Sequence, residues 1–405
     1  MEINNLNKEF ILFTSCNFPT GGPGATYVNS FCKGVKENNG EIRVYLFKGY
    51  IYKDFKNNSG RKNQTDYGVK YTYLGFSTRS KSNVFKLFED ITSILSTFWL
   101  MTKLIFRRNG IIIFVYSNGL FFNLPVYFIS KLFHIKIVSF VPEFLENEEL
   151  EKENIIEQLI SYSFLINYHF INKLSDKLIV FSNFLRNEYI HMGYEGRNII
   201  IQPNLTELNG WYIPSENLYT IGYAGTPSIK DGIIDLMYAV KLLKDNGNLV
   251  NVIIVGDSTN KDSLIPYLHK KSIEFGIVEQ ITFTGLVSQD KVKYYLNQCQ
   301  ILSVTRPDTR QTKAGFPTKL GEYMACKKIV LATKFGDIEN YFSDKIEIVL
   351  AEPGNPSSVA DNILWILNNP DKSETIAKNA FNKATEILDY RNGVKKIMNY
   401  VIIDN

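Results

Sequence analysis

The chain has 405 residues, with 45 Lys and Arg against 41 Asp and Glu, which gives a net charge of +4. This near balance argues against a protein that binds polyanions through bulk charge. Hydrophobic residues make up 45% of the chain and charged residues 21%, so the chain is too apolar for intrinsic disorder. Its length is sufficient for two domains with large cores.

The four cysteines and the first residues point to a reducing compartment. Cys16, Cys32, Cys299 and Cys326 lie far apart and lack the spacing of a zinc site, so we expect free thiols. The first ten residues contain two acids and lack the basic start of a signal peptide. We therefore expect a cytoplasmic protein.

Two apolar stretches are candidate membrane spans, and only the first has about the length that a bilayer requires. The uncharged run 111–130 is interrupted by Asn118, Gly119 and Pro125, which predicts a strand, a loop and then a helix. The run 91–102 is shorter and is flanked by Asp90 and Lys103, which predicts a buried amphipathic helix.

Apolar runs of strand length alternate with helical patterns along the whole chain, which is typical of parallel sheets built from βαβ units. The strands are expected at 9–16, 41–47, 110–117, 135–141, 177–182, 220–225, 250–257, 281–285, 301–305 and 329–333. We therefore predict an α/β fold with two Rossmann-like, doubly wound domains, 1–205 and 206–385, joined by a linker near 206–218. Ligands are expected beyond the carboxyl ends of the strands, where the two domains would form one cleft.

Positive charge is concentrated in the first 140 residues, which contain 18 Lys and Arg against 8 Asp and Glu. Five basic residues flank the apolar run 91–102: Lys81, Lys86, Lys103, Arg107 and Arg108. Two interpretations remain open, a surface that contacts anionic lipid and a solvated rim beside a core helix. Because no nucleic-acid motif accompanies this charge, we expect no nucleic-acid partner.

Two glycine-containing loops follow expected strands. Gly21, Gly22 and Gly24 precede a helical pattern, where backbone N–H groups can approach an anion or a sugar, although a plain tight turn is equally consistent. In the second domain, Gly225 and Thr226 lie between a strand and Lys230. This lysine either neutralises a diphosphate or is a solvated loop residue.

The segment 305–326 carries the most information. It places four basic residues and a Gly-Phe-Pro turn ahead of a helix expected to begin near Thr318. The free N–H groups of that helix and Lys319 suit a pyrophosphate, and Glu322, on the same helical face, suits the diol of a ribose. The alternative is a surface Lys–Glu helix pair.

These residues resemble a known family. The segment GFPTKLGEYMACKKIVLAT at 315–333, together with YAGTPSIKDG at 223–232 and the patterns around them, is similar to the retaining nucleotide-sugar glycosyltransferases of family 4. The motif GFPTKLGEY is typical of one branch. The resemblance covers nearly the whole chain and is strongest in the second domain.

The resemblance implies the GT-B fold, in which the first domain binds the acceptor and the second binds the donor. It also implies a C-terminal helix at 386–405, beginning within the pattern near 382, that returns to the first domain. The donor-binding residues carried over from the family are Lys230, Gly315, Phe316, Pro317, Thr318, Lys319 and Glu322. We add Gly225, Thr226, Arg306 and Lys313 as further donor-binding candidates. Gly21 and Gly22 match the glycine loop that faces the reaction centre, and Gly24 follows them.

Two positions depart from the family pattern. The first of two usual glutamates is replaced by Ala314, and Thr226 stands where an arginine is common. We expect Arg306 and Lys313 to replace the missing positive charge. These departures leave the donor sugar open.

The resemblance implies transfer with retention of configuration, for which no general base is assigned. Glu143, after the strand 135–141, either orients an acceptor hydroxyl or caps a helix. Because no DxD triplet occurs, we expect no metal and no other cofactor. The expected partners are a nucleotide-sugar donor and a saccharide or lipid-linked saccharide acceptor. The expected role is cell-surface polysaccharide synthesis. If the basic residues contact lipid, we expect the protein at the inner face of the membrane.

Three functions from different classes therefore remain. The first is a retaining glycosyltransferase, supported by GFPTKLGEY and Lys230. The second is a nucleotide-sugar epimerase on the same scaffold, and the third is a non-catalytic sugar-binding homologue, suggested by Ala314 alone.

Overall fold

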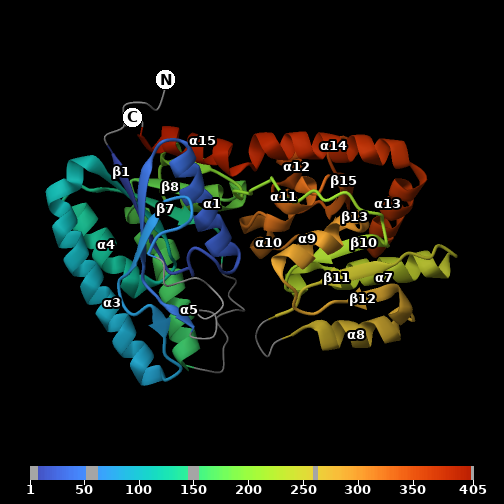
Figure 1. Cartoon of the computed structure of the whole chain (residues 1–405), viewed down its shortest axis with the longest axis horizontal. Helices are drawn as coiled ribbons and strands as arrows, with labels where there is room; N and C mark the ends of the chain where they lie inside the picture. The colour runs from blue at the N-terminus through green and yellow to red at the C-terminus, as the bar shows by residue number, and fades with distance from the viewer. Residues whose placement is uncertain (1–7, 52–62, 145–154, 259–262, 403–405) are drawn as a thin grey trace. The chain divides into compact units, whose positions relative to one another are not determined.

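The computed structural model describes residues 8–51, 63–144, 155–258 and 263–402. The chain divides into two compact units, which are described separately. Unit 1 comprises 1–205 and 390–405, and unit 2 comprises 206–389. Each unit is a parallel sheet with helices on both faces, which confirms the predicted fold class of two Rossmann-like domains (Figure 1).

The sheet of unit 1 has seven parallel strands in the order β4-β2-β1-β6-β7-β8-β9. Its strands are β1 (Glu9–Thr14), β2 (Glu41–Leu46), β4 (Lys70–Tyr73), β6 (Ile111–Tyr116), β7 (Lys136–Val141), β8 (Lys177–Val180) and β9 (Ile199–Ile201), with a separate pair β3 (Tyr50–Ile51) and β5 (Thr78–Arg79). Its helices are α1 (Pro23–Glu37), α3 (Asn83–Leu104), α4 (Leu120–Leu132), α5 (Ile155–Ile166), α6 (Asn183–His191) and α15 (Tyr390–Ile402). The central strands are almost fully buried, as their continuous apolar runs require.

The sheet of unit 2 has six parallel strands in the order β12-β11-β10-β13-β14-β15. Its strands are β10 (Tyr219–Ala224), β11 (Val252–Val255), β12 (Ile281–Phe283), β13 (Cys299–Val304), β14 (Ile329–Thr333) and β15 (Val349–Ala351). Its helices are α7 (Ile233–Asp245), α8 (Ile265–Glu274), α9 (Gln289–Asn297), α10 (Arg310–Ala314), α11 (Thr318–Ala325), α12 (Ile338–Tyr341), α13 (Pro356–Asn368) and α14 (Pro370–Ile387). In both units the strand order reverses beside the first strand, between β1 and β6 and between β10 and β13.

The segment expected to be a linker packs onto unit 2. Leu208 and Trp211 belong to its hydrophobic core. The buried Asn297 donates to the carbonyl oxygen of Trp211 (2.7 Å) and accepts from the N–H of Ile213 (2.9 Å). The Asn, Gly and Pro residues of 206–218 therefore indicate a segment without regular secondary structure. This segment is packed as part of unit 2 and is not a flexible linker.

The C-terminal part of the chain is two helices, not one helix beginning near 382. Helix α14 ends at Ile387, and α15 begins at Tyr390. The carbonyl oxygen of Leu388 accepts from the N–H of Thr206 (2.8 Å), which stabilises a break at this point. Helix α15 packs on α1 within unit 1, and Tyr390 donates to Glu37 (2.6 Å).

The prediction of strand, loop and helix for 111–130 is confirmed by β6 and α4, whereas the prediction for 91–102 is wrong in one respect. Helix α3 is longer, and its large apolar side chains are mostly exposed. The spacing of apolar residues in the sequence indicated an apolar face of this helix, but it did not indicate which face packs against the rest of unit 1. No described helix is long and apolar enough to cross a bilayer.

Candidate functional site

The strongest concentration of functional side chains lies at the carboxyl ends of β10 and β13, at the point where the strand order of unit 2 reverses. Open parallel sheets bind ligands at such switch points, because the loops from neighbouring strands turn to opposite faces there. The loop after β10 contains Gly225 and Asp231, and Arg306 follows β13. Helix α11 begins nearby with Thr318 and Lys319, as the sequence predicted.

One buried carboxylate holds two cations at this point. Asp231 Oδ1 lies 2.7 Å from Lys319 Nζ and 3.3 Å from Arg306 Nη2. Asp231 is buried and the two cations are largely buried, with exposed side-chain fractions of 4% for Asp231, 12% for Lys319 and 14% for Arg306. The group carries two positive charges and one negative charge, so a net positive charge remains.

The neighbouring charges change the titration of this group. Burial raises the pKa of the Asp231 carboxyl, but Lys319 and Arg306 outweigh burial and lower this pKa to about 2. Burial lowers the pKa of the Lys319 ammonium to about 8, with Asp231 opposing this shift and Arg306 adding to it. The Asp231 carboxyl is thus ionised at neutral pH, and the Lys319 ammonium loses its proton at a pH just above neutral.

Further contacts fix the two cations. Lys319 Nζ donates to the hydroxyl of Tyr223 (2.6 Å) and lies 4.0 Å from the centre of its ring. Arg306 lies over the ring of Phe335, and its Nε is buried without a hydrogen-bond partner among the described residues. Buried donors are normally satisfied, so this atom is a candidate donor to a bound anion.

Two glycines allow the close approach of these loops. Gly225 has φ of 137°, and a Cβ added there would lie 2.8 Å from Lys319 Cε. Gly232 has φ of 65°, and a Cβ there would lie 1.7 Å from the carbonyl oxygen of Thr305. Because Gly232 ends the turn 229–231, this approach directs Asp231 inward beside Arg306.

Lys230 and Thr226 are placed differently from the buried cations. Both are exposed, and Thr226 donates to the carbonyl oxygen of Asp257 (3.4 Å). Sequence analysis selected Lys230 and missed Asp231, the next residue. Tyr223 was also missed, because an apolar strand offers no signal that one of its side chains contacts a distant lysine.

The segment before α11 supplies backbone groups. Gly315 ends α10, Pro317 precedes the first residue of α11, and Phe316 packs in the core against Tyr341. The first N–H groups of α11 lack carbonyl partners in their own helix, as at any helix start. Lys313 is paired with Asp308 (2.9 Å) and is half exposed, so its charge is not added to the buried cations.

Glu322 lies one turn after Thr318 on α11, and Ala314 is fully buried. The Glu322 side chain is partly buried. Burial raises the pKa of Glu322 to about 7, although Lys319 and Lys293 oppose this shift. A poorly solvated carboxylate is suited to accept hydrogen bonds from ligand hydroxyls.

A second group lies at the reversal point of unit 1. Gly22 precedes α1, Gly21 packs near Ala25, and Gly24 lies where a Cβ would contact Cys16 Sγ at 2.8 Å. Ser15 and Ser117, after β1 and β6, are hydrogen-bonded at 2.7 Å.

Glu143 is exposed at the same edge of unit 1, two residues after β7. It lines a small hollow with Asn118 and Tyr168. Burial raises the pKa of the Cys16 thiol, and the charge of Glu143 contributes to this shift. Glu143 is thus near Cys16, the residue that an added Cβ on Gly24 would contact.

Comparison with known proteins finds a family model that matches part of unit 2. Residues 213–383 match the family model "Glycosyl transferases group 1". The uncharacterized glycosyltransferase MJ1178 of Methanocaldococcus jannaschii is 27% identical over 229 residues, which are 56% of this chain and 58% of that protein. The aligned region thus spans less than two thirds of this relative.

Solved structures show the fold over the whole chain. Anabaena Alr3699/HepE in complex with UDP has a TM-score of 0.69 at 15% identity and covers 96% of this chain and 98% of its own. A glycosyltransferase from Rickettsia africae has a TM-score of 0.71 at 16% identity and covers 98% of both chains. These similarities confirm the GT-B fold class.

Proposed function

We propose that this chain, whose second unit matches the glycosyl transferases group 1, is a retaining glycosyltransferase of the family 4 type. It transfers a hexosyl or related sugar from a nucleotide-diphosphate donor to a saccharide or glycolipid acceptor. The observation that carries this proposal is the pair of buried cations, Lys319 and Arg306, held by Asp231 at the switch point of unit 2. HepE, which shares the fold, has been crystallised with UDP and with UDP-glucose, and this supports a nucleotide-sugar ligand.

The chemistry follows from the charges. The bond between the sugar C1 and the diphosphate oxygen breaks, and the leaving diphosphate takes the electron pair. Lys319, Arg306 and the first N–H groups of α11 stabilise that developing negative charge. The acceptor hydroxyl oxygen bonds to C1 on the face that the diphosphate leaves, and its proton passes to the diphosphate, so the configuration is retained.

The other ligand contacts are assigned by position. Glu322 binds the ribose, and the backbone of Gly315, Phe316 and Pro317 lines the sugar and phosphate, while Thr318 contacts the phosphates. Unit 1 binds the acceptor, with Gly21, Gly22 and Gly24 in its loop and Glu143 orienting the hydroxyl. Lys230, Gly225 and Thr226 belong to the donor side, and Lys313 lies at its rim.

Because the fixed cations already compensate the leaving charge, we propose that transfer needs no metal ion. The protein acts in cell-surface polysaccharide synthesis, in the cytoplasm, at the inner face of the membrane. Acceptors carried on lipid are presented at that face.

A turnover assay tests the proposal. Purified protein is incubated with a panel of nucleotide sugars, with and without saccharide acceptors, and the released nucleotide diphosphate and the products are measured. Release that depends on the acceptor, with NMR showing the donor's anomeric configuration in the product, supports a retaining transferase. Turnover without acceptor indicates an epimerase, and the absence of turnover with retained binding indicates a non-catalytic homologue.

A further inference from the structure

Helix α3 has the reverse of the usual amphipathic orientation. Near its middle it buries the small polar side chains of Ser93 and Thr97, with Met101 buried one turn further on. Its exposed side carries Leu95 and Trp99, with exposed fractions of 66% and 63%. A helix on a water-facing surface normally buries its large apolar residues, so this surface is suited to a partner that is itself apolar.

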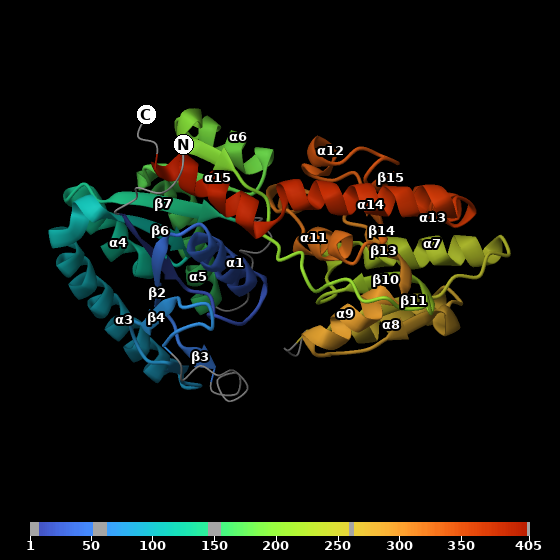
Figure 2. The same cartoon turned by 45° about the horizontal axis from the view of Figure 1, so that its top comes forward.

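The apolar surface continues onto the neighbouring helix. Helices α3 and α4 lie side by side along unit 1 (Figures 1 and 2). We define the α3–α4 face by six of its large exposed residues, which are Phe85, Phe88, Leu95, Trp99, Phe121 and Phe128. Such a set is larger than the scattered apolar residues that a soluble surface usually carries.

Positive charge lies at both ends of α3. Lys81 and Lys86 are at its start, and Lys103 follows Trp99, with Nζ lying 3.2 Å from the centre of the indole ring. The acids of 79–108 are Glu89 and Asp90, and Arg79 pairs with both. The unbalanced charge around the apolar stripe is therefore positive.

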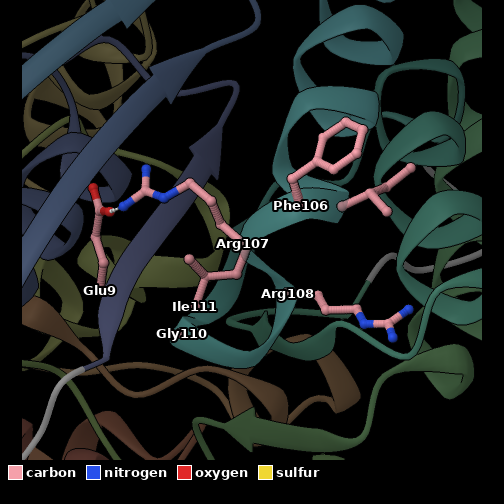
Figure 3. A pocket seen from close by; sticks show the side chains of 7 residues that line it. Glu9, Phe106, Arg107, Arg108, Gly110 and Ile111 are labelled. Carbon is pink, nitrogen blue, oxygen red and sulfur yellow. Dashed lines mark hydrogen bonds and ion pairs between the residues drawn. The ribbon is translucent and has the colours of Figure 1, made fainter.

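A hollow adjoins the C-terminal end of α3. It has a volume of about 690 Å³ and is lined in part by Phe106, Arg107 and Arg108. Arg107 reaches toward Glu9, whereas Arg108 points away from this pair (Figure 3). Phe106 is 92% exposed. Because β1 and β6 begin here, the hollow is at the sheet edge opposite to the glycine loop and does not belong to the candidate acceptor site.

We propose that the α3–α4 face docks on an anionic lipid bilayer, with α3 lying in the interfacial plane. Phe85, Leu95 and Trp99 insert among the acyl chains, while Lys81, Lys103 and Arg108 contact lipid phosphates. An apolar stripe with basic residues at both ends is complementary to such a surface. A second copy of the chain would instead bring two basic rims together, which is unfavourable. The inference does not depend on transferase activity, because binding is measured directly.

The experiment is flotation of the full chain with vesicles of phosphatidylcholine alone and with added phosphatidylglycerol. We expect binding to increase with the anionic fraction and to decrease with added salt. Combined Phe85→Ser, Leu95→Ser and Trp99→Ser should weaken binding at least about 100-fold, since each inserted apolar side chain contributes roughly tenfold. The matched control combines Leu249→Ser, Ile273→Ser and Leu286→Ser, which are equally exposed in unit 2 and should leave binding unchanged.

A second measurement needs no destabilising change. Brominated acyl chains should quench Trp99 fluorescence in the wild type, and the quenching should disappear in Trp99→Phe, which keeps the other two tryptophans. Absence of quenching, or binding that is independent of anionic lipid, overturns the proposal. A second copy of the chain covers the face if the wild type is dimeric and does not bind vesicles while the triple variant is monomeric. That result also overturns the proposal.

Discussion

Lys319 Nζ and Asp231 Oδ1 form a buried ion pair at 2.7 Å, and the two residues come from elements 88 positions apart in the chain. Burying two charges is costly unless their geometry is good and further partners are present. Ser228 supplies one such partner by donating to Asp231 Oδ2 (2.6 Å), and Arg306 supplies another. A bound diphosphate would add negative charge next to Lys319 and Arg306, whose combined charge exceeds that of Asp231.

Replacing Arg306 by alanine should weaken donor binding by about 10- to 100-fold, the loss typical of a charge-assisted hydrogen bond. The matched control is Lys313→Ala, because Lys313 is half exposed and paired with Asp308, and it should change donor affinity far less. Calorimetric titration with the donor found in the turnover assay measures both. Equal effects of the two substitutions would contradict the assignment of Arg306.

The pair also sets a limit on stability in acid. The pKa of the Asp231 carboxyl is lowered from its ordinary value of 3.8 to about 2 in the folded protein, so its contribution to stability is complete above pH 4. That contribution, roughly 2 kcal/mol, is lost as the pH falls through about 2. Asp231→Asn should therefore be less stable than the wild type at pH 7, and the difference should narrow below pH 4.

Urea unfolding at several pH values measures this difference. The control is Asp308→Asn, in a half-exposed ion pair that contributes at most about 1 kcal/mol. A gap between the wild type and Asp231→Asn that stays constant from pH 7 to pH 2 would show that the ion pair does not stabilise the fold.

Gly225→Ala should impair the site more than the fold. The new Cβ would lie 2.8 Å from Lys319 Cε and must displace this side chain, and the backbone strain at φ of 137° costs about 1–3 kcal/mol. Gly276→Ala is the control, because Gly276 also has positive φ but no atom within 4 Å of an added Cβ. We expect both variants to lower the melting temperature and only Gly225→Ala to weaken donor binding. Unchanged donor affinity in Gly225→Ala would argue against a role for Lys319.

The sequence predicts the sheets because buried parallel strands are continuous apolar runs, and it predicts the start of α11 because Pro317 and the preceding glycine leave few alternatives. It does not show which of Lys230 and Asp231 points inward. That choice depends on Gly232, whose positive φ lets the turn lie against Thr305. Such a contact between segments more than 70 residues apart has no local signal.

The orientation of α3 was beyond the sequence for a related reason. Its period shows one apolar face and one face with Ser93 and Thr97, and a soluble fold ordinarily buries the apolar one. Here α3 packs against α4 and buries Ser93 and Thr97 in its middle, so the usual rule gives the wrong side. Only the packed structure reveals that the larger apolar side chains remain uncovered.

Removal of metal ions should leave transfer intact. If Lys319 and Arg306 compensate the charge of the leaving diphosphate, activity in excess EDTA should stay within about twofold of the untreated value. The control is the same assay with added Mg²⁺ in place of EDTA. A loss of more than tenfold in EDTA that Mg²⁺ restores would show that a metal bridges the diphosphate.

Glu322 should have opposite effects on stability and on ligand binding. Burial raises the pKa of this carboxyl to about 7 from 4.5, so the folded protein holds a proton there that the unfolded chain has already lost. Stability from this group is complete below about pH 4.5 and is lost as the pH rises through about 7. Glu322→Gln removes that loss, so it should be more stable than the wild type at pH 8.

An amide oxygen accepts hydrogen bonds less strongly than a carboxylate, so donor affinity should fall about 10-fold in Glu322→Gln. The exposed Glu279→Gln is the control for both measurements. Wild-type donor affinity should itself rise as the pH approaches 7 and Glu322 ionises, and it should fall again as Lys319 loses its charge near pH 8. If Glu322→Gln keeps full donor affinity at pH 8, the carboxylate does not bind the ribose, and the nucleotide is held by other residues.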